Sequence, residues 1–193
     1  MDHQEALRLF IDQGALLNGH FELTSGLHSD TYLQCALLLQ HPPVAERACY
    51  ALAAKWSDQE INSVIGPATG GIIVAYELAR QLGVKALFAE RVDGRMMLRR
   101  GFSVSPREKV LVVEDVMTTG GSAAEVIEML DEIGATTVGA ACLVDRGGLK
   151  RFSEYTTNSL LKIAPPTWNP SDCPLCADGK PIDKPGSRGI KSV

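Results

Sequence analysis

The chain of 193 residues is long enough for one domain with a full hydrophobic core and too short for two large ones. Hydrophobic residues make up 45% of it, close to the average for globular proteins, which argues against disorder of the whole chain. Its formal net charge of -4 argues against a nucleic-acid partner, because proteins that bind a phosphate backbone usually present a basic face.

Two further features bear on location and redox state. The sequence contains no apolar run close to the roughly 20 residues that a membrane helix needs, and its first residues are acidic and polar, unlike those of a signal peptide. We therefore expect a cytoplasmic protein without a membrane partner. The five cysteines are scattered, which favours reduced thiols over a disulfide framework.

The first third of the chain contains two predicted helices and two short strands. Apolar residues at helical spacing predict an amphipathic helix over residues 3–17, and strand candidates follow at residues 21–23 and 31–33. A second helix is predicted from Pro42 to about Trp56, because proline is tolerated in the first turn of a helix.

From residue 63 onward, short apolar runs alternate with helical patterns. Strands are predicted at residues 63–65, 86–89, 110–113 and 138–144. Helices follow the first and third of these strands and end near Gly83 and Gly134. This alternation predicts an α/β fold with a mostly parallel central sheet flanked by helices. Ligands of such sheets bind beyond the carboxyl ends of the strands, so we expect the chemistry in those turns.

Two adjacent acids, Glu114 and Asp115, follow the apolar run of residues 110–113. Buried carboxylates need hydroxyl donors, a cation or solvent, and the neighbouring hydroxyls of a ribose would suit both acids. The small residues up to Ser122 lead into a helix, whose first N–H groups and dipole favour a phosphate. This segment could hold a ribose 5-phosphate by both ends. The alternative is that the acids are surface residues and the small residues only cap the helix.

The motif also differs from two common nucleotide-binding loops. It matches neither the Walker A loop nor the Gly-x-Gly-x-x-Gly turn of dinucleotide-binding proteins. Instead, VLVVEDVMTTGGS at residues 110–122 closely resembles the signature with which type I phosphoribosyltransferases bind phosphoribosyl diphosphate (PRPP).

Two further segments resemble the orotate phosphoribosyltransferases in particular. GHFELTSGLHS at residues 19–29 is similar to the hood segment of that family, and LVDR at residues 143–146 ends where the family has its orotate-contacting arginine. The ending, with CPLC at residues 173–176 and PGSR at residues 185–188, resembles one branch of the family.

The resemblance implies a type I phosphoribosyltransferase fold in one domain, residues 1–193. A small N-terminal hood would cover about residues 1–40, the core about residues 41–164, and an irregular tail residues 165–193. The implied reaction joins orotate to the ribose of PRPP and yields orotidine 5′-phosphate and diphosphate, a step of pyrimidine biosynthesis. The resemblance also implies Mg²⁺ held mainly through PRPP, and a homodimer in which each subunit lends its mobile loop to its neighbour.

The resemblance assigns roles to individual residues. Glu114 and Asp115 would hold the ribose hydroxyls. The PRPP-binding residues would be Glu114, Asp115, Val116, Met117, Thr118, Thr119, Gly120, Gly121 and Ser122. The orotate-binding residues would be Thr118, Arg146, Ser25 and Gly26, and the diphosphate loop Ala68, Thr69, Gly70 and Gly71. The alternative for Arg146 is a surface or helix-terminal arginine, and for the loop an ordinary strand-to-helix turn.

The chain departs from the family where lysines are common. It has Thr24 in the hood segment and Gly70 in the diphosphate loop, and residues 89–101, which match the mobile catalytic loop, contain no Lys and no His. The positive charge of this loop must therefore come from arginines. We expect Arg91, Arg99 and Arg100 to act in catalysis with Glu114 and Asp115; Arg95 is less clearly placed. The alternative for this stretch is a solvated β-hairpin.

The pair Cys173-x-x-Cys176 supplies only half of a tetrahedral zinc site, and the sequence has no second paired motif. His20, His28 or Cys35 could complete such a site only through folding that the sequence does not reveal. We therefore expect no metal bound directly by the protein, and we expect His28 to hydrogen-bond backbone.

Two other functions fit part of the pattern. A purine or uracil phosphoribosyltransferase shares the PRPP signature, but the hood segment and Arg146 argue against it. A PRPP-sensing regulator with the same fold would bind nucleic acid, and the net acidity argues against that function.

Overall fold

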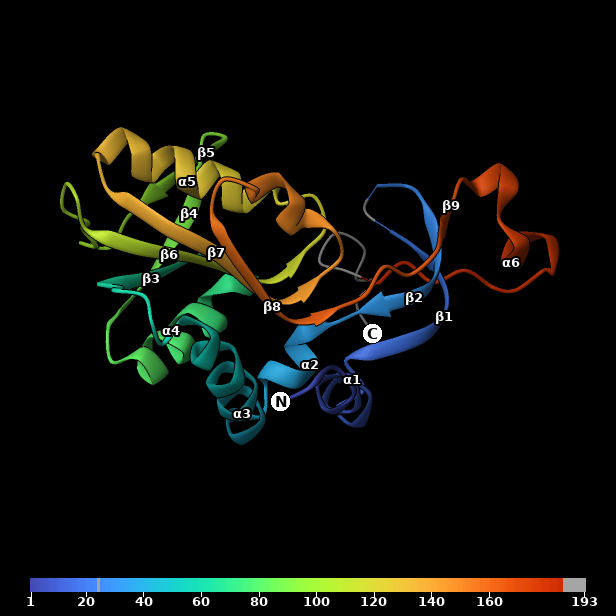
Figure 1. Ribbon diagram of the computed structural model, residues 1–193. Helices are drawn as coiled ribbons and strands as arrows, with labels where there is room; N and C mark the ends of the chain where they lie inside the picture. The colour runs from blue at the N-terminus through green and yellow to red at the C-terminus, as the bar shows by residue number, and fades with distance from the viewer. Residues whose placement is uncertain (24, 186–193) are drawn as a thin grey trace.

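The computed structural model describes residues 1–23 and 25–185. At its centre is a six-stranded sheet with the order β5-β4-β3-β6-β7-β8 (Figure 1). The strands are β3 (Ser63–Pro67), β4 (Lys85–Val92), β5 (Arg95–Leu98), β6 (Lys109–Met117), β7 (Thr136–Asp145) and β8 (Thr156–Lys162). Neighbouring strands are parallel except β5, which is antiparallel to β4. The predicted mostly parallel sheet is confirmed.

Helices cover both faces of this sheet (Figure 1). Helices α3 (Pro42–Ala53) and α4 (Gly70–Leu82) lie on one face, and α5 (Gly121–Ile133) lies on the other. The continuous apolar run of β6 explains this arrangement, because alternate side chains enter the two layers. Leu111 packs in the core beside α3 and α4, whereas Val112 packs in the core beside α5.

The helix ends agree with the predicted glycine positions in the core of the fold. Helix α4 ends at Gly83, with a φ of 71°, and α5 ends at Gly134, with a φ of 79°. These left-handed conformations suit glycine, which has no Cβ to clash. Helix α3 continues into a 3-10 turn, η1 (Ala54–Trp56), so the predicted end of that helix at Trp56 is also confirmed.

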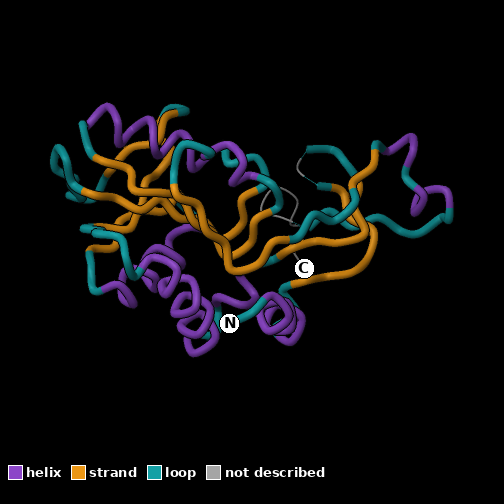
Figure 2. Tube along the Cα trace, viewed as in Figure 1, coloured by secondary structure: helices purple, strands orange, loops and turns teal. Residues whose placement is uncertain are grey.

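A second, smaller sheet forms the hood, with the order β1-β2-β9 (Figure 2). Its strands are β1 (Leu16–Glu22), β2 (His28–Leu33) and β9 (Thr167–Trp168), and the short helix α2 (Cys35–Leu39) connects the hood to α3. Helix α1 (His3–Asp12) begins with a capping box between Asp2 and Glu5. The predicted helix over residues 3–17 is too long, because Gly14 has a left-handed φ of 64° and the chain then enters β1.

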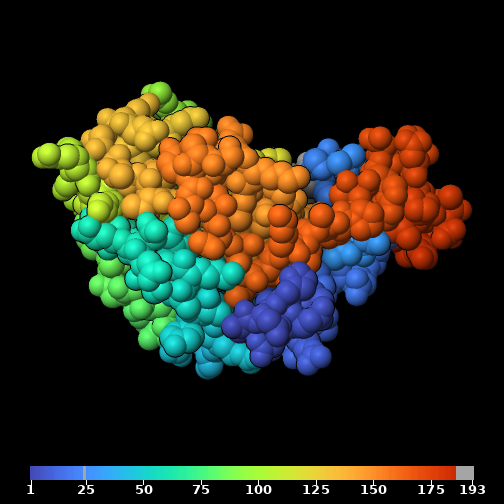
Figure 3. Space-filling view, viewed as in Figure 1, coloured from blue at the N-terminus to red at the C-terminus, as the bar shows by residue number. Residues whose placement is uncertain are grey.

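The tail is part of the hood, whereas we expected it to be irregular. It contributes β9, the 3-10 turn η3 (Pro170–Asp172) and the short helix α6 (Pro174–Ala177). Strand β9 pairs with β2, and Asp183 forms a bridge with Phe21 of β1. The tail, coloured orange to red, thus forms the far end of the molecule (Figure 3). Within the predicted PGSR segment, all but Pro185 lies outside the described residues. Of the helices in the described ranges, none has the length and apolar character needed to cross a membrane.

Candidate active site

A cavity of ≈ 550 Å³ opens between the hood and the carboxyl ends of β6 and β7. Small-molecule sites typically have volumes of about 300–1,000 Å³, so the cavity is large enough for a substrate. Its lining residues come from the hood, the core and the tail: Leu23, Ser25, Leu27, Tyr32, Leu33, Gln34, Cys35, Asp115, Val116, Thr118, Thr119, Arg146, Ala164, Pro165 and Thr167. A cavity thus lies at the ends of these two strands, where the sequence predicted the chemistry.

The acid pair lies within β6, which runs on to Met117, and not after the strand as the sequence suggested. Burial and the neighbouring Asp115 charge raise the pKa of Glu114 to about 7, against a smaller lowering by the Ser122 hydroxyl. Burial also raises the pKa of Asp115, partly offset by the N–H of Val116. Among the described residues, neither acid has an ion-pair partner. The pair is therefore ready to accept hydroxyl donors or to bind a cation.

The predicted diphosphate loop lies directly against this acid pair. A Cβ added to Gly70 would lie 2.5 Å from Oδ1 of Asp115, so only a glycine leaves the carboxylate its present position. A Cβ on Gly66 would lie 2.4 Å from the carbonyl oxygen of Gly71, so the tight turn requires a residue without a side chain at position 66. Ala68 and Thr69 are exposed at the tip of the loop, and the first N–H groups of α4 have no acceptor within the helix. An anion beside Asp115 would meet these N–H groups.

The turn from β6 into α5 is built around Gly120. This residue has a φ of 69° and precedes α5 without a side-chain cap, so the first N–H groups of the helix remain available for an anion. The N–H of Gly121 lies 3.4 Å from Oγ1 of Thr119, and no other residue of the described ranges accepts from the N–H groups of residues 121–123. A Cβ on Gly120 would lie 2.9 Å from the carbonyl oxygen of Gly148, in the 3-10 turn η2 (Gly148–Phe152) that supports the loop.

The predicted PRPP-binding residues differ in their exposure. Thr118 and Thr119 are exposed and line the cavity, as does the half-buried Val116. Met117 is fully buried in the core, so only its backbone is available at the site.

Arg146 follows β7 and lines the same cavity. Its backbone N–H donates to the carbonyl oxygen of Met117 at 2.9 Å, which holds the ends of β6 and β7 together. Its Nε is buried and has no hydrogen-bond partner in the described part of the chain. Burial lowers the pKa of the guanidinium, with a smaller opposing effect of Tyr32. A buried, unpaired N–H donor is costly, and a planar anion with parallel oxygens would satisfy it.

The neighbouring Asp145 does not serve as the missing partner. Its Oδ1 accepts hydrogen bonds from the N–H groups of Gly147, at 2.7 Å, and Leu149, at 3.2 Å. This buried carboxylate thereby stabilises the turn after β7.

The hood contributes one predicted residue and one that the sequence analysis missed. Ser25 lines the cavity, and Gly26 is next to it in a turn with a φ of 79°, while Thr24 is outside the described residues. Tyr32 also lines the cavity, and its pKa is raised by burial and by Asp115 and lowered by Arg146. Tyr32 is thus close to both charged groups, a position that no local sequence pattern indicated.

The predicted catalytic arginines do not line this cavity. Residues 89–101 contain the β4–β5 hairpin, as the alternative interpretation proposed. Nη1 of Arg91 pairs with Glu125 of α5 at 2.5 Å, and Nη2 of Arg100 pairs with Glu90 at 2.8 Å. Arg99 is also absent from the cavity lining, and Arg95 lies 3.7 Å from Glu132. A catalytic role of these arginines stays a prediction.

The folded chain also brings the Cys173–Cys176 pair close to two histidines. His28 does not bond backbone as expected, since its Nδ1 lies 3.0 Å from Nε2 of His20 and 3.3 Å from Sγ of Cys176. Cys35 is not part of this group, because its Sγ lies 4.0 Å from the carbonyl oxygen of Asp115.

Comparison with known proteins shows the family of the chain. Residues 38–176 match the family model of the phosphoribosyl transferase domain. The orotate phosphoribosyltransferase of Desulforamulus reducens is 52% identical over 190 residues, 98% of this chain and 100% of that protein. The one of Carboxydothermus hydrogenoformans is 55% identical over 183 residues, 94% of this chain and 96% of that protein.

A solved structure shows the same relationship. The crystal structure of orotate phosphoribosyltransferase from Aeropyrum pernix has a TM-score of 0.66 and 30% identity, and the match covers 81% of this chain and 93% of that chain. Adenine phosphoribosyltransferase from Thermoanaerobacter pseudethanolicus shares the fold, with a TM-score of 0.62 at 17% identity, over 69% of this chain and 88% of that one. The chain belongs to the phosphoribosyltransferase family and, within it, to the orotate phosphoribosyltransferases.

Proposed function

We propose that the chain joins orotate to the ribose of PRPP and releases diphosphate, a step of pyrimidine biosynthesis. The observation that carries the proposal is the buried, unpaired Nε of Arg146, in the same cavity as Asp115 and Thr118. A donor in this position lacks an anionic acceptor, and the carboxylate of orotate supplies one. Free purines and uracil carry no carboxylate, so they leave this donor poorly satisfied.

Each substrate group has a matching protein group. Glu114 and Asp115 accept hydrogen bonds from the ribose hydroxyls. Residues 118–122 surround the 5-phosphate, to which the N–H groups at the start of α5 donate. The diphosphate lies on the loop of residues 68–71, next to Asp115. Arg146 and Thr118 hold orotate in the same cavity, which Ser25 of the hood also lines, with Gly26 next to Ser25 in the chain.

The reaction requires positioning more than a protein nucleophile. The bond from ribose C1 to the diphosphate oxygen breaks, and its electron pair leaves with diphosphate. A ring nitrogen of orotate forms the new bond to C1 with its own electron pair, and the proton of that nitrogen is released to solvent or to the departing diphosphate. The protein holds the two reacting atoms in line and stabilises the charge that moves onto diphosphate. The hood and tail residues that line the cavity limit the access of water, which would otherwise hydrolyse PRPP.

The acid pair fits a magnesium ion that arrives with PRPP. Two half-buried carboxylates without an ion-pair partner in the described chain match the preference of Mg²⁺ for oxygen ligands. Glu114 and Asp115 would hold it through the ribose hydroxyls and water. Bound there, Mg²⁺ would neutralise charge on the departing diphosphate.

A homodimer would explain the position of the loop arginines. Arg99 and Arg100, which follow the hairpin, do not line the cavity of their own chain, so these side chains would serve a neighbouring subunit. Helix α4 exposes Ile73 and Tyr76, with 47% and 65% of their surfaces accessible, beside an apolar cavity of ≈ 520 Å³. An exposed apolar area of this kind supports an interface between subunits. Sedimentation of the purified chain tests the dimer, and localisation in the cytoplasm remains a proposal.

An acceptor screen tests the proposed function. The purified chain is incubated with PRPP and Mg²⁺ and offered orotate, uracil, adenine, guanine or hypoxanthine, and diphosphate release is followed. We expect diphosphate release when orotate is the base and not when any of the other four bases is offered. Release with a purine or uracil instead would support the other phosphoribosyltransferases, and PRPP binding without release would support the sensor.

A further inference from the structure

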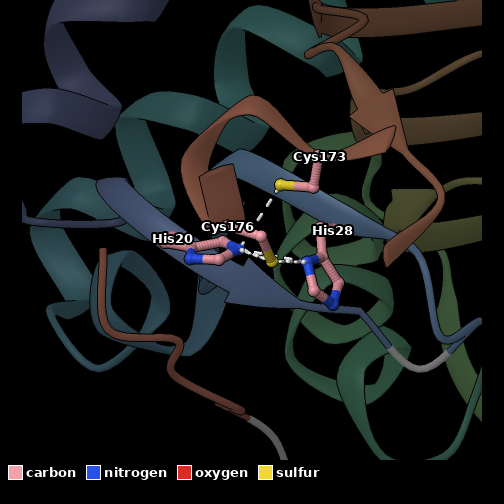
Figure 4. A group of neighbouring side chains, drawn as sticks. All are labelled: His20, His28, Cys173 and Cys176. Atoms are coloured by element: carbon pink, nitrogen blue, oxygen red, sulfur yellow. Dashed lines mark hydrogen bonds between the residues drawn. The ribbon is translucent and has the colours of Figure 1, made fainter. Parts of the chain in front are cut away.

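Four side chains from three segments meet at the far end of the hood (Figure 4). His20 is on β1, His28 is on β2, and Cys173 and Cys176 are at the start of α6 and within it. One atom from each, a ring nitrogen or a sulfur, lies within 4.8 Å of all the others. The sequence analysis named His20 and His28 as possible partners of the cysteine pair but could not place them, since His20 and Cys173 are 153 positions apart in the sequence.

The distances between these atoms match the edges of a zinc tetrahedron. With Zn–N bonds of about 2.05 Å and Zn–S bonds of about 2.3 Å, the N···N edge is about 3.3 Å and the N···S edge about 3.6 Å. Nε2 of His20 lies 3.0 Å from Nδ1 of His28, 3.5 Å from Sγ of Cys173 and 3.7 Å from Sγ of Cys176. The remaining short edge, from Cys176 to His28, is 3.3 Å. The four atoms therefore need only small shifts to surround one ion.

The hydrogen bond on the other side of His20 directs a lone pair into the cluster. Nδ1 of His20 lies 2.9 Å from the carbonyl oxygen of Lys180, which only accepts, so this nitrogen carries the hydrogen. Nε2 of neutral His20 then has a free lone pair. A backbone carbonyl that orients a ligating histidine in this way is a usual feature of metal sites.

Hydrogen bonds alone explain this arrangement poorly. Nε2 of His20 has one lone pair, yet one nitrogen and two sulfur atoms approach it. A single cation at the centre satisfies all four groups at once. His20, His28 and Cys173 are buried, with 4%, 8% and 3% of their surfaces accessible, while Cys176 is exposed and leaves a route for the ion.

We propose that His20, His28, Cys173 and Cys176 bind a structural zinc ion that ties the tail to the hood. Two thiolates and two imidazoles are the ligand set of closed, tetrahedral zinc sites. Binding releases the two thiol protons and leaves no open coordination position, so the ion has no part in the proposed reaction.

The tail has few other contacts that would stabilise its position on the hood. Helix α6 has only four residues and none of them is buried, so neither its length nor its packing stabilises it. Strand β9 pairs with β2 through only two residues. The same segment begins with Ala164, Pro165 and Thr167, which line the candidate active site. A metal at residues 173 and 176 would therefore fix the tail segment whose first residues line the cavity.

Metal analysis of the purified wild-type chain is the first test. The chain is purified with a thiol reductant, without chelator, and analysed by plasma mass spectrometry. We expect zinc at about one mole per mole of chain, and an apparent Kd at pH 7 tighter than about 0.1 μM. Cobalt(II) added to the stripped chain should give thiolate-to-cobalt charge-transfer bands and the visible bands of a tetrahedral ion.

Matched variants locate the ion. The Cys173→Ser, Cys176→Ser double variant should lose the zinc, while Cys49→Ala and His41→Ala, which change the same residue types elsewhere in the chain, should retain it. Asp115→Asn should also retain it, since the ion is not at the acid pair. In the zinc-depleted chain, proteolysis within residues 169–183 should be about tenfold faster.

Three results would overturn the proposal, and wild-type data decide even if the double variant fails to fold. They are purified wild-type chain that neither contains zinc nor gives the cobalt charge-transfer bands, equal metal loss in the control variants, and a Cys173–Cys176 disulfide in active protein that was purified with a thiol reductant. None of these results would bear on the proposed transfer to orotate, which the acceptor screen tests separately.

Discussion

Replacing Arg146 by alanine tests the assignment of the orotate site in the greatest detail. The guanidinium has a buried, unpaired Nε in the free chain, so its removal takes away no protein hydrogen bond from that atom. A hydrogen bond to a charged group contributes about 1.5–3 kcal/mol, and removing a bidentate contact to orotate should cost about 3 kcal/mol of transition-state binding. This corresponds to a decrease of about 100-fold in kcat/KM for orotate.

The same substitution should leave the fold and PRPP binding nearly intact. Because the lost Nε was desolvated without a partner among the described residues, the free energy of unfolding should stay within about 1 kcal/mol of wild type or rise. The KM for PRPP should change less than threefold, because an indirect effect of the substitution on PRPP binding should not exceed about 0.6 kcal/mol. Arg151→Ala, an exposed arginine in η2, is the matched control and should behave as wild type. Steady-state kinetics with each substrate varied in turn, together with thermal unfolding, give these values. Equal losses for orotate and PRPP would refute the reasoning.

Three further substitutions test the acid pair and the loop beside it. Asp115→Asn should lower kcat at least about tenfold with little change in unfolding free energy, and wild-type turnover would refute the ribose role. Gly70→Ala introduces a Cβ at 2.5 Å from Oδ1 of Asp115, so it should raise the KM for PRPP without greatly changing the KM for orotate; an unchanged KM for PRPP would contradict the close approach. Glu114 has a pKa of about 7 in the folded chain, above its unfolded value, so the folded state binds the extra proton between about pH 4.5 and 7. The free energy of unfolding of the substrate-free chain should therefore decrease by about 2 kcal/mol as pH rises through this window, and denaturant titrations of Glu114→Gln should lack that decrease.

Much of the core fold could be predicted from local patterns. The run of residues 110–113 is apolar throughout because helices cover both faces of β6, and a strand in that position has no polar side. The ends of α4 and α5 were visible as Gly83 and Gly134, since each needs a left-handed conformation. The first helix was overextended because Leu16 and Leu17 continue its apolar spacing, although Gly14 has already ended it.

The hood and the tail were harder to predict. Strand β9 pairs through two residues only, which is too short for an alternating pattern to appear. The zinc ligands belong to segments that meet only after the tail has folded back onto β1 and β2. A spacing motif records neighbours along a helix or loop and says nothing about contacts of this kind.

The site was predicted in its parts but not in its assembly. The acid pair lies near the carboxyl end of β6, the glycine turn follows that strand and Arg146 follows β7, and the rule for parallel sheets predicts that strand ends meet. The contact between Gly70 and Asp115 depends on the adjacency of β3 and β6, which the sequence order of the strands does not give. Tyr32 reaches the cavity from another sheet, so only the three-dimensional structure reveals it.

The most direct measurement of the central claim is the consumption of orotate by the purified chain in the presence of PRPP, with and without Mg²⁺, alongside diphosphate release. We predict that one diphosphate is released for each orotate consumed, and that both processes stop when Mg²⁺ is removed. Folded chain that consumes no orotate under these conditions, or that releases diphosphate equally well without it, would contradict the account.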